Sequence, residues 1–275
     1  MKKIIALTLA LLMVGAVLVA CGGSQTTTAD ATKDSAPTAA KGSDLEAVQA
    51  KGKLIVGITD FEPMDYQEES GKWIGFDADL AAAFAESLGV KAEFVEIDWD
   101  NKVLELDGGT IDCVWNGMTL TDEVTSAMSC SDPYCNNAQV VVVNKNVADK
   151  YAQADACKEL NFAVESGSAG QEQATAYGFK FTEVKDQATA LMEVASGACD
   201  AAIIDSLMAA AMVGEGTGYE QLTYTASLNS EEYGVGFRKG SDLTAKLNEF
   251  FAAAKADGSM EKVAETYKVQ AALIK

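Results

Sequence analysis

Histidine is absent from this chain of 275 residues, and its absence excludes several kinds of active site. Without an imidazole the chain cannot form a Ser-His or Cys-His catalytic triad or carry out histidine acid–base chemistry. Most zinc sites lose a preferred ligand as well. We therefore expect a protein that is not an enzyme, with no catalytic residue, no metal ion and no cofactor.

Positive charge is scarce too. Lysine and arginine together number 21 against 41 aspartate and glutamate residues, which gives a formal net charge of −20, and Arg238 is the only arginine. An acidic surface repels polyanions over long distances. The charge balance therefore argues against nucleic acid as a partner.

The N-terminal segment is typical of an exported lipoprotein. Lys2 and Lys3 precede an almost unbroken apolar run, and the sequence Leu-Val-Ala-Cys at 18–21 resembles a bacterial lipobox. Cleavage before Cys21 would free a thiol for a diacylglyceryl group, and lipidation, with acyl chains such as palmitate, then anchors the chain to a membrane. We expect a signal peptide over 1–20 and a mature protein lipid-anchored at the extracellular face of the cell membrane. An ordinary secretory signal with an incidental cysteine is the alternative.

A stretch rich in Gly, Ser, Thr and Ala follows, without apolar periodicity. This composition predicts a flexible tether over 21–43. The remaining chain, about 230 residues, is long enough for two lobes of about 100 residues each.

The chain has six cysteines, of which Cys21 belongs to the lipobox. Cys130 and Cys135 flank a turn-rich segment, where a small disulfide would be compatible with export, as would two free thiols. The other three, at 113, 157 and 199, fit small core or surface residues.

Two stretches of the sequence repeat one order of predicted elements: strand, helix, strand, helix, strand. The first comprises 53–58, 77–88, 91–97, 101–106 and 111–115; the second comprises 161–164, 171–177, 180–184, 187–196 and 199–204. At an offset of 88 residues, Leu104 corresponds to Met192, Gly109 to Gly197 and Asp112 to Asp200, and at an offset of 87, Phe94 corresponds to Phe181.

Strands that alternate with helices in this way predict right-handed βαβ units and a parallel-type sheet in each half. We expect an α/β protein of two lobes joined by two hinge strands, at 139–143 and 233–237. Lobe 1 comprises 44–137 plus 235–275, and lobe 2 comprises 138–234. Because open α/β sheets bind ligands at the carboxyl ends of their strands, facing lobes would enclose one cleft. A single doubly wound sheet is the alternative.

Six motifs lie in a fixed order along the folded part, at 53–57, 71–80, 117–121, 131–134, 233–240 and 256–259. Together they resemble the family 3 extracellular solute-binding proteins of amino-acid ABC importers, over nearly all of 44–269. The resemblance implies the periplasmic-binding-protein-like, or Venus flytrap, fold. It also implies a monomer that captures an amino acid or a related amine-bearing ligand between its lobes and delivers it to an ABC permease.

The resemblance also implies a ligand-binding site. In lobe 1, Phe61 and Trp99 stand where aromatic rings sandwich the ligand side chain, although both also fit plain core aromatics. Asn116, Gly117 and Thr119 stand where backbone and hydroxyl groups meet the ligand's α-amino and α-carboxylate groups.

In lobe 2, Asp205 matches the acidic residue that pairs with the ligand's α-ammonium group. A surface carboxylate is the alternative. Ser168 matches the residue that meets the ligand carboxylate near a helix start, where anions are favoured. Glu165 stands where relatives often have a polar or basic residue.

One position departs from the family pattern. The arginine that usually holds the α-carboxylate is replaced by Val124, which cannot act as a bidentate donor. Arg238 lies beyond the run 233–237 and offers no obvious substitute.

The cleft is therefore expected to be acidic, with Glu165 and Asp205 inside it and Asp60 and Glu62 at its rim. We expect a ligand with at least one positive group and a weaker dependence on a free carboxylate. An ordinary amino acid held by backbone donors is the alternative. Two other functions on the same fold also fit the sequence, an exported dehydratase-like enzyme and a ligand sensor for a membrane receptor.

Overall fold

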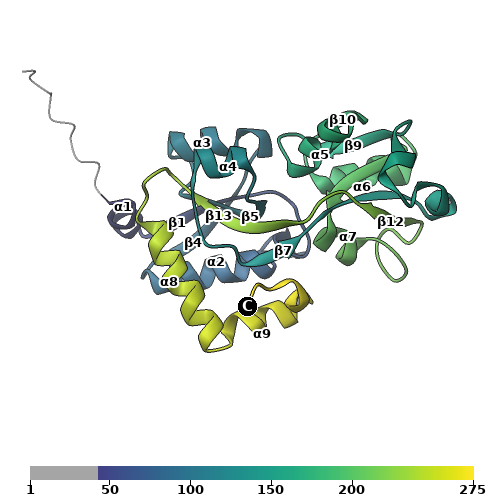
Figure 1. Ribbon diagram of the computed structural model, residues 1–275. Coiled ribbons are helices and arrows are strands. Elements are labelled where there is room, and N and C mark those ends of the chain that lie inside the picture. Colours follow the sequence, from purple (N-terminus) through teal and green to yellow (C-terminus); the bar gives the residue numbers. More distant parts are fainter. Residues whose placement is uncertain (1–42) are drawn as a thin grey trace, which may run out of the picture. The chain divides into compact units, whose positions relative to one another are not determined.

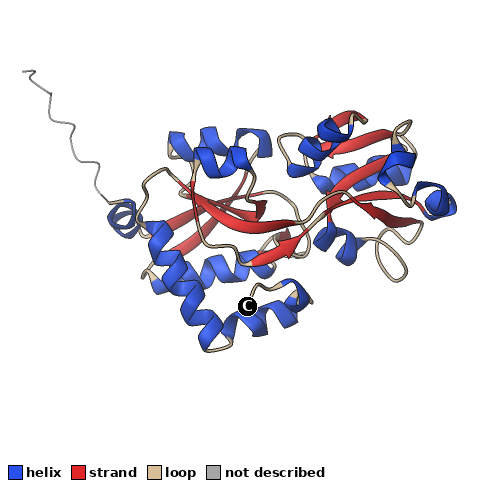
Figure 2. Ribbon diagram, in the orientation of Figure 1, coloured by secondary structure: helices blue, strands red, loops and turns tan. Residues whose placement is uncertain are grey.

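The computed structural model describes residues 43–275, so the predicted signal peptide, Cys21 and the tether up to residue 42 lie outside the described residues. Two β-sheets with helices on their faces organise this part of the chain (Figures 1 and 2). Among residues 43–275, no helix has the length and apolar character needed to span a bilayer.

The first sheet belongs to lobe 1. In spatial order its strands are β4 (Lys91–Glu96), β1 (Lys53–Ile58), β5 (Cys113–Thr119), β13 (Glu231–Phe237) and β6 (Ser129–Cys130), and β7 (Cys135–Asn137) also pairs with β13. Its helices are α1 (Asp44–Lys51), α2 (Phe76–Ser87), α3 (Lys102–Gly108), α4 (Asp122–Ala127), α8 (Leu243–Ala256) and α9 (Ser259–Thr266). In Figure 1, α3 and α4 lie on one side of this sheet and α2 and α8 on the other. A two-stranded hairpin, β2 (Tyr66–Gln67) and β3 (Trp73–Ile74), precedes α2.

The second sheet belongs to lobe 2. In spatial order its strands are β10 (Lys180–Val184), β9 (Asn161–Glu165), β11 (Ala201–Asp205), β8 (Gln139–Asn144) and β12 (Leu222–Ser227). Its helices are α5 (Ala169–Tyr177), α6 (Gln187–Ser196) and α7 (Ser206–Met212). Short 3-10 helices occur at η1 (Trp99–Asn101), η2 (Lys145–Tyr151), η3 (Ala154–Cys157) and η4 (Gln270–Ala272).

The strands of the predicted repeat are parallel in both sheets, and each sheet also contains one antiparallel member next to them. β1 is parallel to β4 and β5, and β9 is parallel to β10 and β11. β13 runs antiparallel to β5, and β8 runs antiparallel to β11. The sheets are therefore mixed, because each receives a strand that enters from the other lobe. The chain crosses between the sheets at Ala138, after β7, and between β12 and β13.

Residues at matching repeat positions have matching structural roles. Gly109 and Gly197 end α3 and α6 in the left-handed conformation, with φ of 76° and 80°, which glycine adopts without the cost of a Cβ. Asp112 accepts a hydrogen bond from the amide of Ile55 at 2.7 Å, and Asp200 accepts one from Asn161 at 2.9 Å. Each aspartate directly precedes a strand, β5 or β11, and ties it to the neighbouring strand of its sheet, β1 or β9. The two halves of the chain therefore repeat in structure as well as in sequence.

The disulfide that the sequence left open is not formed. Cys130 and Cys135 are both free. Cys130, on β6, pairs with Gly236 of β13, and Cys135, on β7, pairs with Tyr233 of the same strand. Three residues along one strand are roughly 10 Å, beyond the reach of a disulfide.

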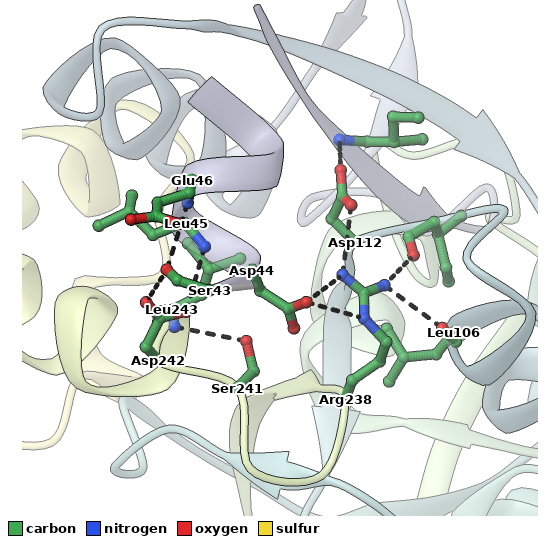
Figure 3. A network of polar contacts seen from close by, with 12 residues as sticks. Ser43, Asp44, Leu45, Glu46, Leu106, Asp112, Arg238, Ser241, Asp242 and Leu243 are labelled. Atoms are coloured by element: carbon green, nitrogen blue, oxygen red, sulfur yellow. Dashed lines mark hydrogen bonds and ion pairs between the residues drawn. The ribbon is translucent and has the colours of Figure 1, made fainter. Parts of the chain in front are cut away.

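Arg238 has a structural role within lobe 1, which Figure 3 shows. Its Nη2 lies 3.2 Å from Asp44 Oδ1 and 3.5 Å from Asp112 Oδ1. Its Nη1 donates to the carbonyl of Ile111 at 2.9 Å. These contacts join α1 to the segment that leads into β5, and the only arginine is thereby committed away from the cavity described next.

Candidate ligand-binding site

A small cavity, about 30 Å³ in volume, lies between the two sheets and is lined by both lobes. All eight residues that the sequence predicted as ligand-binding line it: Phe61, Trp99, Asn116, Gly117, Thr119, Glu165, Ser168 and Asp205. Its other lining residues are Lys102, Met118, Thr121, Glu123, Val124, Gly167, Ala169, Glu172 and Gln187. Among residues 43–275, no group of three or more His, Cys, Asp or Glu is placed to hold a metal ion.

The carboxyl ends of three strands deliver polar side chains to this cavity. Thr119 ends β5, Glu165 ends β9 and Asp205 ends β11. Both sheets present the same end because the repeat builds them with the same strand order. Ligands of open α/β sheets bind at this edge.

Asp205 is buried and surrounded by neutral hydrogen-bond donors. Its Oδ1 accepts from the hydroxyl of Tyr233 at 2.6 Å and from Nε2 of Gln139 at 3.1 Å. The amides of Asn137 and Gln187 donate to it as well. Burial, together with the charge of Glu231, raises the pKa of Asp205 to about 7. No described cation forms an ion pair with this carboxylate.

Glu165 is the second buried acid in the cavity, with 2% of its surface exposed. Its Oε2 accepts a long hydrogen bond of 3.4 Å from Gln187, and Oε1 has no partner among the described residues. Burial and the nearby charge of Asp205 raise the pKa of Glu165 to about 8. A buried acceptor without a donor is costly, so this oxygen suits a ligand that brings a donor.

The predicted polar residues of lobe 1 already have partners within the protein. The side chain of Asn116 exchanges two hydrogen bonds with Thr59, at 3.0 and 2.8 Å. The amide of Gly117 donates to Asp77 at 2.6 Å, and the hydroxyl of Thr119 donates to Glu231 at 2.9 Å. These contacts hold the three residues in the wall of the cavity. Hydrogen bonds from these residues to a ligand remain predictions.

Both predicted aromatic residues are buried at the cavity. Phe61 packs edge-on against Tyr233, with ring centroids 6.4 Å apart. A Cβ added to Gly117 would lie 2.6 Å from Phe61 Cε1, so glycine allows this close packing. The ring centroid of Trp99 lies 5.1 Å from Nζ of Lys102.

Ser168 caps α5, where its hydroxyl accepts a hydrogen bond from the amide of Gln171 at 3.2 Å. The first turn of this nine-residue helix therefore begins at the cavity. Helix N-termini carry unpaired amide groups and a positive end of the dipole, which favours an anionic ligand group.

The two residues that the sequence suggested at the rim do not line the cavity itself. Asp60 and Glu62 line a separate surface pocket together with Glu96, Lys185 and Asp186. Four charged or amide-bearing residues of the cavity had no place in the predicted site, namely Lys102, Glu123, Glu172 and Gln187. The pattern at 101–106 indicated only a short helix, and nothing local shows that its lysine is buried.

The two lobes touch beside the cavity. Nζ of Lys102 donates to the carbonyl of Gly167 at 2.8 Å, and Lys185 forms an ion pair with Glu96. Gly167 adopts φ of +71°, and a Cβ added there would lie 2.7 Å from Cα of Asp100. Backbone of one lobe thus packs directly on backbone of the other.

Comparison with known proteins accounts for this arrangement. The profile of the bacterial extracellular solute-binding proteins, family 3, matches residues 54–270. The chain belongs to this family. The region matched includes every residue of the cavity and both sheets apart from Lys53, the first residue of β1.

Individual relatives of this solute-binding protein cover most of its length. It is 29% identical over 227 residues to the L-cystine-binding protein TcyJ of Escherichia coli, covering 81% of this chain and 85% of that one. It is 30% identical over 233 residues to the arginine-binding extracellular protein ArtP of Bacillus subtilis, covering 82% and 90%. An ABC uptake transporter substrate-binding protein from Streptococcus pneumoniae, solved with bound histidine, aligns with a TM-score of 0.77 at 27% identity over 85% of this chain and 99% of that one.

Proposed function

We propose that this solute-binding protein captures an amino acid, or a related amine-bearing ligand with a positive group, between its lobes and delivers it to an ABC importer. The names of its relatives support the ligand class, since they include cystine-, arginine- and histidine-binding proteins. The lipobox at 18–21 supports a mature protein held at the membrane through Cys21. The ABC permease is the proposed protein partner, and the protein acts as a monomer.

The observation that carries the ligand assignment is the pair of buried acids. Glu165 and Asp205 are 2% and 4% exposed and line the same cavity. A buried carboxylate that forms no ion pair is costly, and a ligand ammonium group would offset that cost. Charge-assisted hydrogen bonds of this kind are stronger than neutral ones.

The binding mechanism follows from the placement of the cavity. A ligand that contacts Asp205 on one lobe and Thr119 on the other makes both sets of contacts only when the lobes are close together. Because a ligand shifts an equilibrium by its differential affinity for the two states, these bridging contacts favour the closed form. The closed form is the one proposed to dock on the permease, and the lipid tether keeps the protein at a high effective concentration beside it.

A thermal-shift screen of the mature chain tests the proposal. We expect at least one of L-arginine, L-histidine and L-cystine to raise the melting temperature, since a ligand at 100 times its dissociation constant adds about 2.7 kcal/mol of stability. Acidic amino acids such as L-glutamate, which would bring a further negative charge to the cavity, serve as the control. Stabilisation by L-glutamate alone would contradict the ligand class.

From the buried acids we also predict that a rise in pH lowers the stability of the ligand-free protein and raises its affinity for a cationic ligand. Burial raises the pKa of Asp205 and Asp77 to about 7 and that of Glu165 to about 8. The stability that these protonated groups confer is fully present below the unfolded-state pKa of about 4, and it is lost as the pH rises through 7 to 8.

The ligand-free protein should therefore melt at a lower temperature at pH 8 than at pH 5. A cationic ligand binds the ionised carboxylates, so its affinity should rise over the same interval. L-Arginine is the suitable probe, because its side chain does not titrate between these values. Melting curves with and without arginine at several pH values measure both trends. If the ligand-free melting temperature and the affinity for arginine both rose, or both fell, with pH, the assignment would be contradicted.

A further inference from the structure

The cavity contains one cationic side chain, and its surroundings are unusual for a lysine. Lys102, the first residue of α3, is 5% exposed. Burial lowers its pKa, while the nearby charges of Glu123, Glu165 and Glu172 act in the opposite direction. A buried ammonium group is costly unless an anion pairs with it.

No carboxylate in the described part of the chain forms an ion pair with Lys102. Its Nζ instead donates to two carbonyl oxygens, those of Gly167 at 2.8 Å and Trp99 at 3.3 Å. An ammonium group has three N–H donors, so these contacts leave one for another acceptor. Lys102 is therefore a buried cation at the cavity that has carboxyl groups nearby, those of Glu123, Glu165 and Glu172, but forms an ion pair with none of them among the described residues.

The position of this ammonium group suits an anionic ligand group. Gly167, whose carbonyl it contacts, directly precedes Ser168, the cap of α5. An anion beside Lys102 would thus also lie near the amide groups at the start of that helix, which favour negative charge. Val124, on α4, lines the same cavity and brings no charge, so α3 rather than α4 supplies the cation.

We propose that Lys102 is the residue that binds the ligand's carboxylate, so that the cavity selects zwitterionic amino acids over the corresponding amines. The proposal rests on the proposed function and sharpens it. The ligand's ammonium group faces Asp205 and Glu165, and its carboxylate faces Lys102 and the start of α5. It replaces the expectation, drawn from Val124 and the acidic cleft, of a weaker dependence on a free carboxylate.

Pairs of ligands that differ only in the carboxylate test this directly. The probes are L-arginine with agmatine and L-histidine with histamine, each titrated calorimetrically. We expect the wild-type protein to bind an amino acid roughly 10- to 100-fold more tightly than its decarboxylated partner, as for a hydrogen bond to a charged group. Equal affinities of the two members would overturn the proposal without any variant.

Lys102→Met separates charge from packing, because methionine keeps much of the apolar stem. In this variant the amino acid should bind roughly 10- to 100-fold more weakly while the affinity for the amine stays within about threefold, so that the discrimination disappears. Lys102→Arg, which keeps the charge, should retain most of the discrimination between the amino acid and the amine. Lys53→Met is the matched control, since Lys53 pairs with Glu93 on the exposed sheet edge, outside the cavity.

Melting curves accompany these titrations. Because the ammonium group is buried without an ion pair, Lys102→Met should melt at the same or a higher temperature than wild type when no ligand is present. Unchanged discrimination in a folded Lys102→Met protein would overturn the role of Lys102 while leaving the proposed function intact. If no member of any pair binds the wild-type protein, the proposed function itself fails, and the role of Lys102 fails with it.

Discussion

Replacing Asp205 by asparagine should weaken amino-acid binding by about 2 to 4 kcal/mol, roughly 30- to 900-fold. The substitution keeps the size of the side chain and removes its charge. The ligand ammonium group would then lose one of its two ionic partners in lobe 2. In either orientation of the new amide, its nitrogen would face a donor, from Tyr233 and Gln139 on one side or from Gln187 on the other. Calorimetric titration with the best amino acid from the screen measures the loss.

The matched control is Asp200→Asn. Asp200 lies directly before β11, at the opposite end from Asp205, and accepts a hydrogen bond from the amide of Asn161 at 2.9 Å. This change should lower stability slightly and leave affinity unchanged. Wild-type affinity in a folded Asp205→Asn protein would remove Asp205 from the site.

Gly167→Ala should weaken binding at least about tenfold by holding the lobes apart. Its added Cβ would lie 2.7 Å from Cα of Asp100 and 2.8 Å from Oδ1 of the same residue. Contacts below 3 Å force the backbone to move, and here the clash is between lobes, so opening relieves it. In this variant, part of the binding free energy is therefore lost to the clash when the ligand brings the lobes together.

The backbone strain of alanine at positive φ needs a control of its own, and Gly178 provides it. Gly178 ends α5 with φ of +69°, and a Cβ added there would meet no atom within 4 Å. Gly178→Ala should lose about 1 kcal/mol of stability, as a residue in this conformation does, and bind normally. Small-angle scattering should show that ligand compacts wild type and Gly178→Ala but not Gly167→Ala. Tight binding with normal compaction in Gly167→Ala would contradict closure at this contact.

Much of the fold could be predicted because its signals are local. The strand predicted at 53–58 and the helix predicted at 187–196 match β1 and α6, since apolar periodicity and a glycine stop mark them. β5 extends four residues beyond the predicted end at 115, to Thr119. Its last residues pair with Tyr233 and Gly234 of β13, far away in the sequence. No local pattern contains that pairing.

The site shows the same division. Residues at strand ends, such as Asp205, were predicted because the topology brings these ends together and the family resemblance names them. Lys102 escaped prediction because its burial depends on Gly167, 65 residues further along the chain and in the other lobe. In sequence, a lysine at a helix start is typical of an exposed residue, and only packing of the second lobe makes it a buried cation.

Two buried carboxyl groups in the cavity receive the positive group of the ligand and lose any bound protons as they do so. Titration of the wild-type protein with L-arginine at pH 6.5, in buffers of different ionisation enthalpy, measures this proton release. Because the pKa values of Asp205 and Glu165 are raised to about 7 and about 8, we expect binding of one arginine to release protons. The observed enthalpy should then vary with the buffer. Saturable binding whose enthalpy is the same in every buffer would show that these carboxyl groups do not receive the ligand's positive group.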